Sequence, residues 1–208
     1  MGPRKPGVIA MGLTGAIGAG KSTALSYFAE LGALTLSADE VVRKLYQQPD
    51  ICSLVAQRFG ADALHESGAV NRRVLADRVC RSLEDLRWLE GLTHPQVAAH
   101  IERFIREAPS GSVVVCEVPL LVETGMESLF DTIVTIEAAP ELRRARSPHA
   151  FGPDVFAQFE RLQATPEERV ARSQFVFFND GSFEALKDFV AKVYDYARQV
   201  VAGPERAN

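Results

Sequence analysis

The chain has 208 residues, 47% of them hydrophobic and 24% charged, which suits one globular α/β domain rather than a disordered or membrane-embedded chain. Its net charge of −4 excludes a general nucleic-acid binder with a basic face. Three widely spaced cysteines predict free thiols in a reducing compartment. No apolar segment near the start is long enough for a signal peptide or a membrane span, so the sequence predicts a cytoplasmic protein without membrane or nucleic-acid partners.

Five short apolar runs are predicted to be β-strands, because parallel strands buried on both faces are apolar along their whole length. They lie at residues 8–14, 33–36, 112–118, 132–136 and 174–178. Helices are predicted at 22–31, 39–46 and 183–201. The alternation of strands with helices indicates an α/β fold, with a five-stranded parallel sheet flanked by helices in one domain of residues 1–208.

Two long stretches without a predicted strand interrupt this alternation. Between about 51 and 108 several helices fit, with breaks expected at Gly60, Ser67-Gly68 and His94-Pro95. The other stretch lies at about 143–170. Helical insertions in phosphotransferases hold the acceptor or close over the donor. The first stretch is therefore interpreted as an acceptor-binding insertion and the second as a lid.

A phosphate-binding loop follows the first predicted strand. Residues 15–22 read Gly-Ala-Ile-Gly-Ala-Gly-Lys-Ser and fit G-x-x-x-x-G-K-[ST] without a mismatch. The glycines let backbone N–H groups turn toward phosphate oxygens, and the next helix directs its N-terminus at the same anion. Lys21 would sit near the β- and γ-phosphates, and the Ser22 hydroxyl would bind Mg²⁺. The expected ATP-binding residues of this loop are Gly15, Ala16, Ile17, Gly18, Ala19, Gly20, Lys21, Ser22 and Thr23.

Further segments, in the same order and spacing over about residues 8–200, resemble the dephospho-CoA kinase family. They are Gly12–Thr23, Leu31-Gly32-Ala33, Ser37-Ala38-Asp39 with Arg43, Asn71-Arg72 with Leu75, His94-Pro95, Pro119–Glu123, Gln163-Ala164-Thr165 with Arg169, and Asn179-Asp180-Gly181. The resemblance implies a P-loop NTPase fold and a kinase that uses ATP and Mg²⁺. The reaction it implies is phosphorylation of the ribose 3′-hydroxyl of dephospho-CoA, the last step of coenzyme A biosynthesis. Two alternatives stay open: a kinase for another small acceptor, such as a nucleoside monophosphate or a shikimate-like alcohol, and a catalytically impaired nucleotide-binding regulator.

The resemblance also assigns roles to acceptor-side residues. Asp39 follows a strand end, where ligands of open α/β sheets bind, and would accept the proton of the acceptor hydroxyl; the competing interpretation is an acid that caps a helix. Arg43 and Arg72 would hold the acceptor, or else be solvated surface arginines. His94 belongs to the same set, although a neutral histidine at a helix break is the simpler interpretation. The full acceptor set is Asp39, Arg43, Arg72, His94, Pro119, Leu120 and Glu123.

Two residues that follow strands are assigned to the nucleotide side. Glu117 ends the apolar run at 113–116, as the acid of a Walker B strand does, and with Ser22 it would hold the metal. Asn179 follows the fifth predicted strand, where the resemblance puts the adenine of ATP. A simple turn is the alternative for Asn179.

The chain departs from the family pattern at Ser37, where the family usually has aspartate, and at Pro148, where it usually has an arginine in the lid. Arg143 and Arg146 are helical neighbours at i,i+3, whereas Arg144 points about 100° away from Arg143. We therefore predict that Arg146, with Arg143, contacts the ATP phosphates and that Arg146 is catalytic. Arg169 is the alternative.

Overall fold

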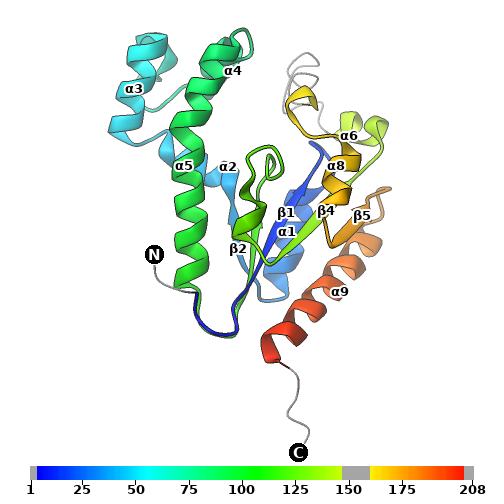
Figure 1. The fold of residues 1–208 in the computed structure, drawn as a ribbon. Coiled ribbons are helices and arrows are strands. Elements are labelled where there is room, and N and C mark those ends of the chain that lie inside the picture. Colours follow the sequence, from blue (N-terminus) through cyan, green and yellow to red (C-terminus); the bar gives the residue numbers. More distant parts are fainter. Residues whose placement is uncertain (1–3, 147–159, 204–208) are drawn as a thin grey trace, which may run out of the picture. The chain divides into compact units, whose positions relative to one another are not determined.

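The computed structural model describes residues 4–146 and 160–203, which belong to two compact units (Figure 1). The first unit contains the residues up to Ser37 together with those from Ile101 onward, and it holds the sheet. The second unit, Ala38–His100, is helical. The helical unit therefore begins and ends earlier in the chain than the insertion predicted at about 51–108.

The sheet has five parallel strands, as the sequence predicted, and their order is β2-β3-β1-β4-β5. Their bounds are β1 Ile9–Gly15, β2 Leu34–Ser37, β3 Val113–Glu117, β4 Thr132–Glu137 and β5 Phe175–Phe178. Each bound agrees with its predicted strand to within one residue. The central strands β1, β3 and β4 are buried at every position, which explains why each one is a continuous apolar run.

Helices α1 (Lys21–Glu30) and α9 (Phe183–Ala202) cover one face of the sheet. Both agree with helices predicted from apolar periodicity. Their buried side chains join those of β1 in one core cluster, which includes Met11, Leu13, Phe28, Leu186 and Val190. The Ser182 hydroxyl caps α9 by accepting a hydrogen bond from Ala185 N–H at 3.1 Å. This packing fixes the start of α9 beside the end of β5.

The opposite face of the sheet carries shorter elements. They are η2 (Met126–Leu129) and α8 (Pro166–Ala171), and α6 (Pro140–Arg146) follows β4. At Gly12, which alternates with the core residues of β1, an added Cβ would lie 2.6 Å from Leu121 and 2.9 Å from Phe130. Only glycine therefore leaves room for the segment that packs across β1 on this face.

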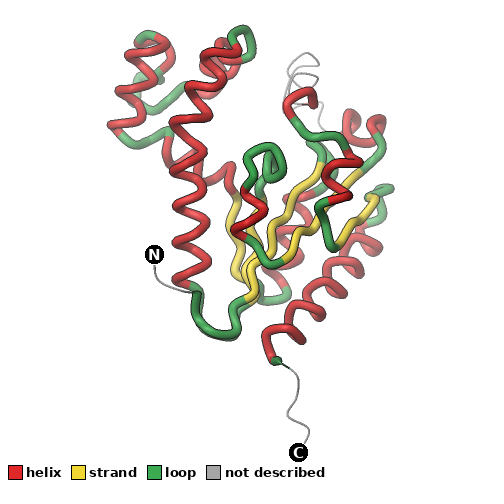
Figure 2. Tube along the Cα trace, in the orientation of Figure 1, coloured by secondary structure: helices red, strands yellow, loops and turns green. Residues whose placement is uncertain are grey.

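The helical unit has a separate hydrophobic core. Its helices are α2 Ala38–Leu45, α3 Pro49–Phe59, η1 Ala61–Ala63, α4 Arg72–Val79 and α5 Leu83–Glu107, of which α5 runs on past the unit boundary. Within the described residues, Figure 2 shows helices and loops in this unit but no strand, as predicted. Phe59 packs edge-to-face against Trp88, with ring centroids 5.5 Å apart, in a cluster built on Ile51, Val55 and Leu75.

The predicted helix break at His94-Pro95 is wrong, because α5 continues through Pro95. Proline cannot donate a backbone hydrogen bond and crowds the preceding turn. The missing N–H of Pro95 deprives the Gly91 carbonyl of its helical donor. On either side of the proline, Thr93 Oγ1 donates to the Leu89 carbonyl at 2.8 Å and Gln96 Nε2 donates to the Leu92 carbonyl at 3.0 Å. None of the helices in the described ranges, α5 included, is long and apolar enough to cross a membrane.

The three cysteines are free thiols, as predicted. Cys116 lies fully buried on β3, and burial raises the pKa of its thiol to about 12. Cys52 is also buried and donates a weak hydrogen bond to the Tyr46 carbonyl at 3.4 Å. Both thiols are therefore packing groups rather than nucleophiles.

Thr14 on β1 presents a testable feature of the buried sheet. Its hydroxyl is fully buried and has no hydrogen-bond partner among the residues that the structure describes. Thr14→Val keeps the shape and removes this group, so the free energy of unfolding should stay the same or rise by about 1 kcal/mol. Thr135→Val is the control, because its hydroxyl pairs with Ser173 Oγ at 2.6 Å. Urea unfolding of both variants checks this, and an equal loss of stability at the two positions would contradict it.

Candidate active site

The phosphate loop takes a backbone path that requires glycine at its two ends. Gly15 has φ of 138°, and an added Cβ there would lie 1.9 Å from the Ile136 carbonyl oxygen. Gly20 has φ of 106°, and a Cβ would lie 2.6 Å from Asn179 Nδ2. Both conformations are costly for residues with a side chain. The motif glycines therefore let the loop pass close to Ile136 of β4 and to Asn179, which follows β5.

Lys21 begins α1 directly after this loop. Its side chain is buried, and Nζ donates to the carbonyl oxygens of Gly15 and Ala16, each at 3.0 Å. Helix α1 has Gly20 as its N-cap, without a side-chain cap and without an acid in its first turn. The first-turn N–H groups and the helix dipole can therefore bind an anion without competition from a capping side chain.

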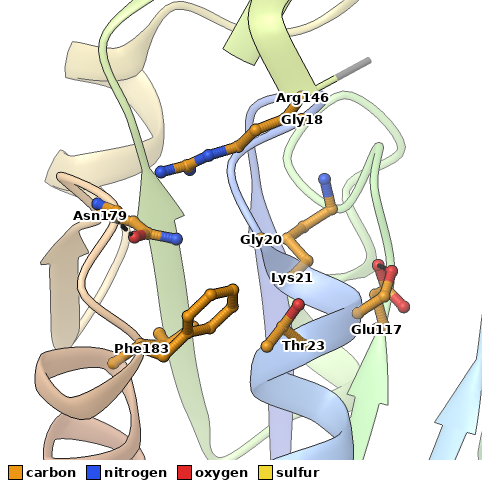
Figure 3. Close-up of a pocket in the computed structure, with 11 residues that line it drawn as sticks. Gly18, Gly20, Lys21, Thr23, Glu117, Arg146, Asn179 and Phe183 are labelled. Atoms are coloured by element: carbon orange, nitrogen blue, oxygen red, sulfur yellow. Dashed lines mark hydrogen bonds between the residues drawn. The ribbon is translucent and has the colours of Figure 1, made fainter. Parts of the chain in front are cut away.

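A pocket of about 400 Å³ opens at this helix N-terminus. The sequence predicted eight of the residues that line it: Gly18, Gly20, Lys21, Ser22, Thr23, Glu117, Arg146 and Asn179. It did not predict the other lining residues, Gly181, Phe183 and Leu186. Figure 3 shows Arg146 reaching across the loop toward Asn179, with the Phe183 ring facing Thr23 below it. The volume and the two cations of the wall suit a phosphorylated nucleotide.

Glu117 lies at the carboxyl end of β3, on the side of the pocket where β2 also ends. It is 6% exposed, and its Oε1 accepts a hydrogen bond from Ser22 Oγ at 3.2 Å. In the parallel register it is paired with Leu13 of β1 and Ser37 of β2. The two predicted metal residues are thus neighbours, brought together because parallel strands end at the same edge of the sheet.

The arginines of the predicted lid have different partners, although they share one helical turn of α6. Arg143 is buried, its Nη1 lies 2.7 Å from Glu160, and its Nε donates to the Ala138 carbonyl at 3.1 Å. Arg144 is exposed, 4.0 Å from the same carboxylate. Only Arg146 lines the pocket, so the structure does not bring Arg143 to the predicted ATP site. Pro148 lies outside the described residues.

Arg169, the alternative arginine for the phosphates, does not line the pocket. It is 2% exposed and forms two bonds to the Glu137 carboxylate, at 2.5 Å from Nε and 3.0 Å from Nη2. A third bond runs to the Ala164 carbonyl. A buried guanidinium needs such partners, and these bonds hold Arg169 within the protein instead of leaving it to reach phosphates.

Asn179 joins the phosphate loop to the segment that follows β5. Its Nδ2 donates to the Ala19 carbonyl at 2.8 Å, and its Oδ1 accepts from Gly181 N–H at 3.1 Å. The residue is buried, with its backbone N–H bonded to the Glu137 carbonyl at 2.7 Å. Asn179 therefore shapes the pocket wall as a turn residue as well as lining it.

The predicted acceptor-binding residues of the turn after β3 form hydrogen bonds within the sheet unit. The Pro119 carbonyl accepts from Gln163 Nε2 at 3.1 Å, and the Leu120 carbonyl accepts from Thr124 Oγ1 at 2.6 Å. The Glu123 carboxylate accepts a hydrogen bond from Ala164 N–H. These contacts tie the turn to the segment before α8, so they give Glu123 a structural role within the sheet unit.

The other predicted acceptor residues belong to the helical unit. Asp39 and Arg43 are exposed one turn apart on α2, and Arg72 is exposed at the first position of α4. Burial raises the pKa of the Tyr46 phenol to about 12, although the nearby Arg72 charge lowers it. His94 is half-buried in α5, and desolvation lowers its pKa, which keeps the imidazole neutral at pH 7.

The sequence interpretation missed two residues of the site's support. Glu137 is the last residue of β4, as Glu117 is the last residue of β3. The pattern that pointed to Glu117, an acid at the end of an apolar run, could therefore have pointed to Glu137 as well. Gln163 contacts the phosphate loop. Gln163 belongs to a segment that resembles the family, but no local pattern in the sequence gives it a partner.

Comparisons with known proteins give the family of the chain. A family model described as dephospho-CoA kinase matches residues 9–185. The dephospho-CoA kinase of Aquifex aeolicus (strain VF5) is 34% identical over 187 residues, which are 89% of this chain and 95% of that protein. The dephospho-CoA kinase of Syntrophotalea carbinolica is 34% identical over 204 residues, 95% of this chain and 96% of that protein.

Solved structures share the fold. TT1252 from Thermus thermophilus has a TM-score of 0.75 and 28% identity, with 93% of this chain and 98% of that chain covered. A shikimate kinase from Acinetobacter baumannii has a TM-score of 0.53 at 14% identity, over 91% and 92% of the two chains, a likeness of fold alone. The family model spans most of the sequence and the relatives match along almost their whole length. The chain therefore belongs to the dephospho-CoA kinase family.

Proposed function

We propose that this protein transfers the terminal phosphoryl group of ATP to the ribose 3′-hydroxyl of dephospho-CoA, the last step of coenzyme A biosynthesis. The observation that carries the proposal is an intact phosphate loop before an uncapped helix N-terminus, in a chain of this family. The products are ADP and CoA. We also propose a cytoplasmic location, because the three free thiols favour a reducing compartment.

The pocket would act by holding and neutralising the phosphates, which is the main task of an enzyme in phosphoryl transfer. The N–H groups at the start of α1 would bind phosphate oxygens, and Lys21 would neutralise charge on the β- and γ-phosphates. These groups are already oriented by the fold, so little reorganisation is needed when charge develops.

Magnesium fits the donor set beside the loop. Ser22 and Glu117 place two oxygen donors 3.2 Å apart, and the described residues hold no group of three or more His, Cys, Asp and Glu that could bind a metal alone. Mg²⁺ usually binds through one or two protein oxygens together with waters and substrate phosphates. We expect Ser22 and Glu117 to hold it, and when bound it would neutralise charge on the β- and γ-phosphates.

For the acceptor, we propose that the helical unit binds dephospho-CoA through Arg43, Arg72 and His94. The two arginines are exposed and can pair with the phosphates of the acceptor. Asp39 follows Ser37, the last residue of β2, by two positions. We propose that Asp39 accepts the proton of the 3′-hydroxyl as that oxygen attacks the γ-phosphorus.

For the nucleotide, we propose that the adenine binds on the side of the pocket formed by Asn179, Gly181 and Phe183. Phe183 is 66% exposed, and its ring lies along the pocket wall (Figure 3), so a flat base can stack on it. Arg146 comes within reach of Gly181, since an added Cβ at Gly181 would lie 3.3 Å from its Nη2. Arg146 would contact the phosphates from this position.

Arg146→Ala should lower kcat by about tenfold or more and weaken ATP binding less, because a contact to the transferring group strengthens in the transition state. Arg144→Ala is the matched control, since Arg144 is an exposed arginine of the same helix that does not line the pocket. Steady-state kinetics with both substrates varied would measure the two constants. Full activity of Arg146→Ala would remove this arginine from the mechanism.

Turnover with separate acceptors tests the proposed function. The purified protein is incubated with ATP, Mg²⁺ and dephospho-CoA, AMP or shikimate, and ADP and the phosphorylated product are measured. We expect turnover with dephospho-CoA and the mass of CoA as product. Turnover with AMP or shikimate instead would favour another kinase of this fold, and no turnover with any acceptor would favour a nucleotide-binding regulator.

A further inference from the structure

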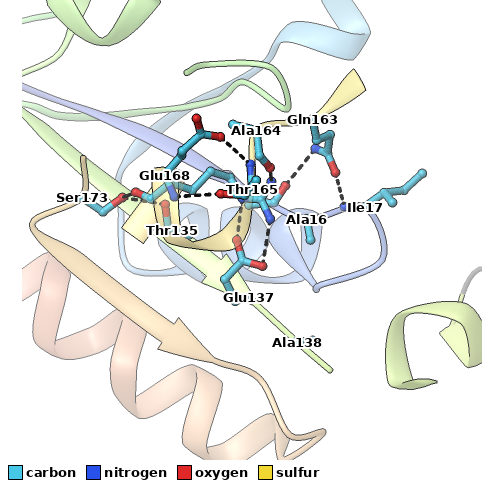
Figure 4. Close-up of polar contacts among 12 residues, drawn as sticks. Ala16, Ile17, Thr135, Glu137, Ala138, Gln163, Ala164, Thr165, Glu168 and Ser173 are labelled. Atoms are coloured by element: carbon cyan, nitrogen blue, oxygen red, sulfur yellow. Dashed lines mark hydrogen bonds and ion pairs between the residues drawn. The ribbon is translucent and has the colours of Figure 1, made fainter. Parts of the chain in front are cut away.

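One side chain outside the pocket connects the phosphate loop to the turn after β3. Gln163 Oε1 accepts a hydrogen bond from Ile17 N–H at 2.9 Å (Figure 4). Its Nε2 donates to the carbonyls of Gly15 at 3.2 Å and Pro119 at 3.1 Å. The amide thus uses its acceptor and its donor group on backbone atoms of two segments. The phosphate loop lines the pocket, and the turn follows Glu117, which also lines it.

The Gly15 carbonyl that Gln163 contacts is also a hydrogen-bond partner of Lys21. The same oxygen accepts from Lys21 Nζ at 3.0 Å. The position of this carbonyl is therefore shared between the catalytic lysine and Gln163. Pro119, the other carbonyl partner, is two residues from Glu117 at the end of β3. The hydrogen bonds of Gln163 thereby connect the start of the phosphate loop to the end of β3, which carries the proposed metal ligand Glu117.

The backbone that follows Gln163 is held by several hydrogen bonds and a buried ion pair. The next residue, Ala164, donates its N–H to the Glu123 carboxylate, and its carbonyl accepts from Arg169. Arg169 and Glu137 form a buried ion pair, with side chains 3% and 4% exposed. Thr165 then begins α8 with a reciprocal capping box to Glu168. The backbone on the α8 side of Gln163 therefore has few alternative conformations.

Buried ion pairs add little net stability but can fix one arrangement of the chain. Here the Glu137–Arg169 pair fixes the position of the Ala164 carbonyl, which accepts a hydrogen bond from Arg169. Ala164 directly follows Gln163, whose side-chain amide contacts the phosphate loop. We propose that Gln163 is a positioning residue for phosphoryl transfer, and that it holds the Gly15–Ile17 turn and Lys21 in the orientation that the transferring phosphoryl group requires. The inference rests on the proposed function, to which it adds a residue that does not contact the substrate.

Gln163→Met tests this role, since methionine keeps the length of the side chain and removes all three hydrogen bonds. We expect kcat to fall by about tenfold or more, the combined effect of bonds that each contribute a factor of a few. The KM for dephospho-CoA should stay within about twofold, because the change affects positioning of the donor rather than acceptor binding. The affinity for ADP, measured by calorimetry, should fall by less than kcat does.

Gln174→Met is the matched control. Gln174 is also a glutamine bonded to sheet backbone, since its Oε1 accepts from Ile133 N–H at 2.7 Å, but at the opposite end of β4. Thermal unfolding of both variants separates stability from catalysis. Equal kcat for the two variants, whatever their stability, would overturn the proposal and leave Gln163 as a structural contact.

Gln163→Glu supplies a second measurement that a purely structural role would not change. A carboxylate can accept from Ile17 N–H but cannot donate to the two carbonyls, whereas the protonated acid regains one donor. The deficit in kcat relative to wild type should therefore shrink as pH falls toward the ordinary glutamate pKa of about 4.3. A deficit that does not vary with pH would count against positioning through hydrogen bonds.

The test stays separate from that of the proposed function. Wild-type turnover with dephospho-CoA decides the substrate, whereas the ratio of variant to wild type decides the role of Gln163. Slow hydrolysis of ATP by water uses the same phosphate loop, so this ratio is also measured without any acceptor. A variant that hydrolyses ATP at the wild-type rate, while the wild type turns over dephospho-CoA normally, would contradict only the inference on Gln163.

Discussion

Replacing Lys21 by methionine is expected to lower kcat by about 10³-fold or more at saturating ATP, because it removes a preorganised charge from the transferring phosphoryl group. Methionine keeps the buried stem, so the melting temperature should change little. Steady-state production of ADP with dephospho-CoA as acceptor measures the effect. The two bonds from Lys21 Nζ to the Gly15 and Ala16 carbonyls hold this charge beside the phosphate loop.

Lys187→Met is the control for this change. Lys187 also carries one positive charge on a helix of the sheet unit, but its side chain is 64% exposed and its Nζ lies 3.9 Å from Glu30. This variant should retain wild-type kcat. A Lys21→Met protein that is folded and turns over at the wild-type rate would exclude the phosphate loop from the mechanism.

Asp39→Asn is expected to lower kcat by about 10²-fold or more, because the amide keeps the shape of the carboxylate but cannot accept the proton of the 3′-hydroxyl. The KM values for ATP and dephospho-CoA should change little, since the removed interaction is made in the transition state. Initial rates over a grid of both substrates, with binding of each measured separately, check the two expectations.

Glu40→Gln is the control for Asp39, because the neighbouring Glu40 is an exposed acid in the same first turn of α2. It should leave kcat unchanged. If Asp39→Asn weakens substrate binding and leaves kcat intact, Asp39 is a structural or metal-orienting group and another residue accepts the proton. If both variants lose the same activity, the effect is one of charge near α2 rather than of proton transfer.

The sequence by itself determined the sheet and the phosphate loop. Strands buried on both faces must be apolar throughout, so the five runs gave the strands to within one residue. Gly15 and Gly20 have positive φ and no room for a Cβ, which is why the loop is recognisable from residue types and spacing alone. Acids after apolar strands are rare enough that Glu117 could also be found in this way.

Only the tertiary structure decided what the side chains around the loop do. Arg143 and Arg146 have the same local context, yet Glu160 pairs with Arg143 and leaves Arg146 to line the pocket. The sequence likewise offered Arg169 as a phosphate ligand, whereas the buried Glu137 carboxylate holds it within the protein.

The helix through Pro95 shows the same limit. Local sequence predicts a break there, but α5 continues through Pro95, and the Gly91 carbonyl loses its helical donor. Gln163 contacts Ile17 across 146 residues of chain. Backbone preference and apolar periodicity are local properties, so the sequence shows them directly. Long-range partners depend on which segments the completed fold brings together.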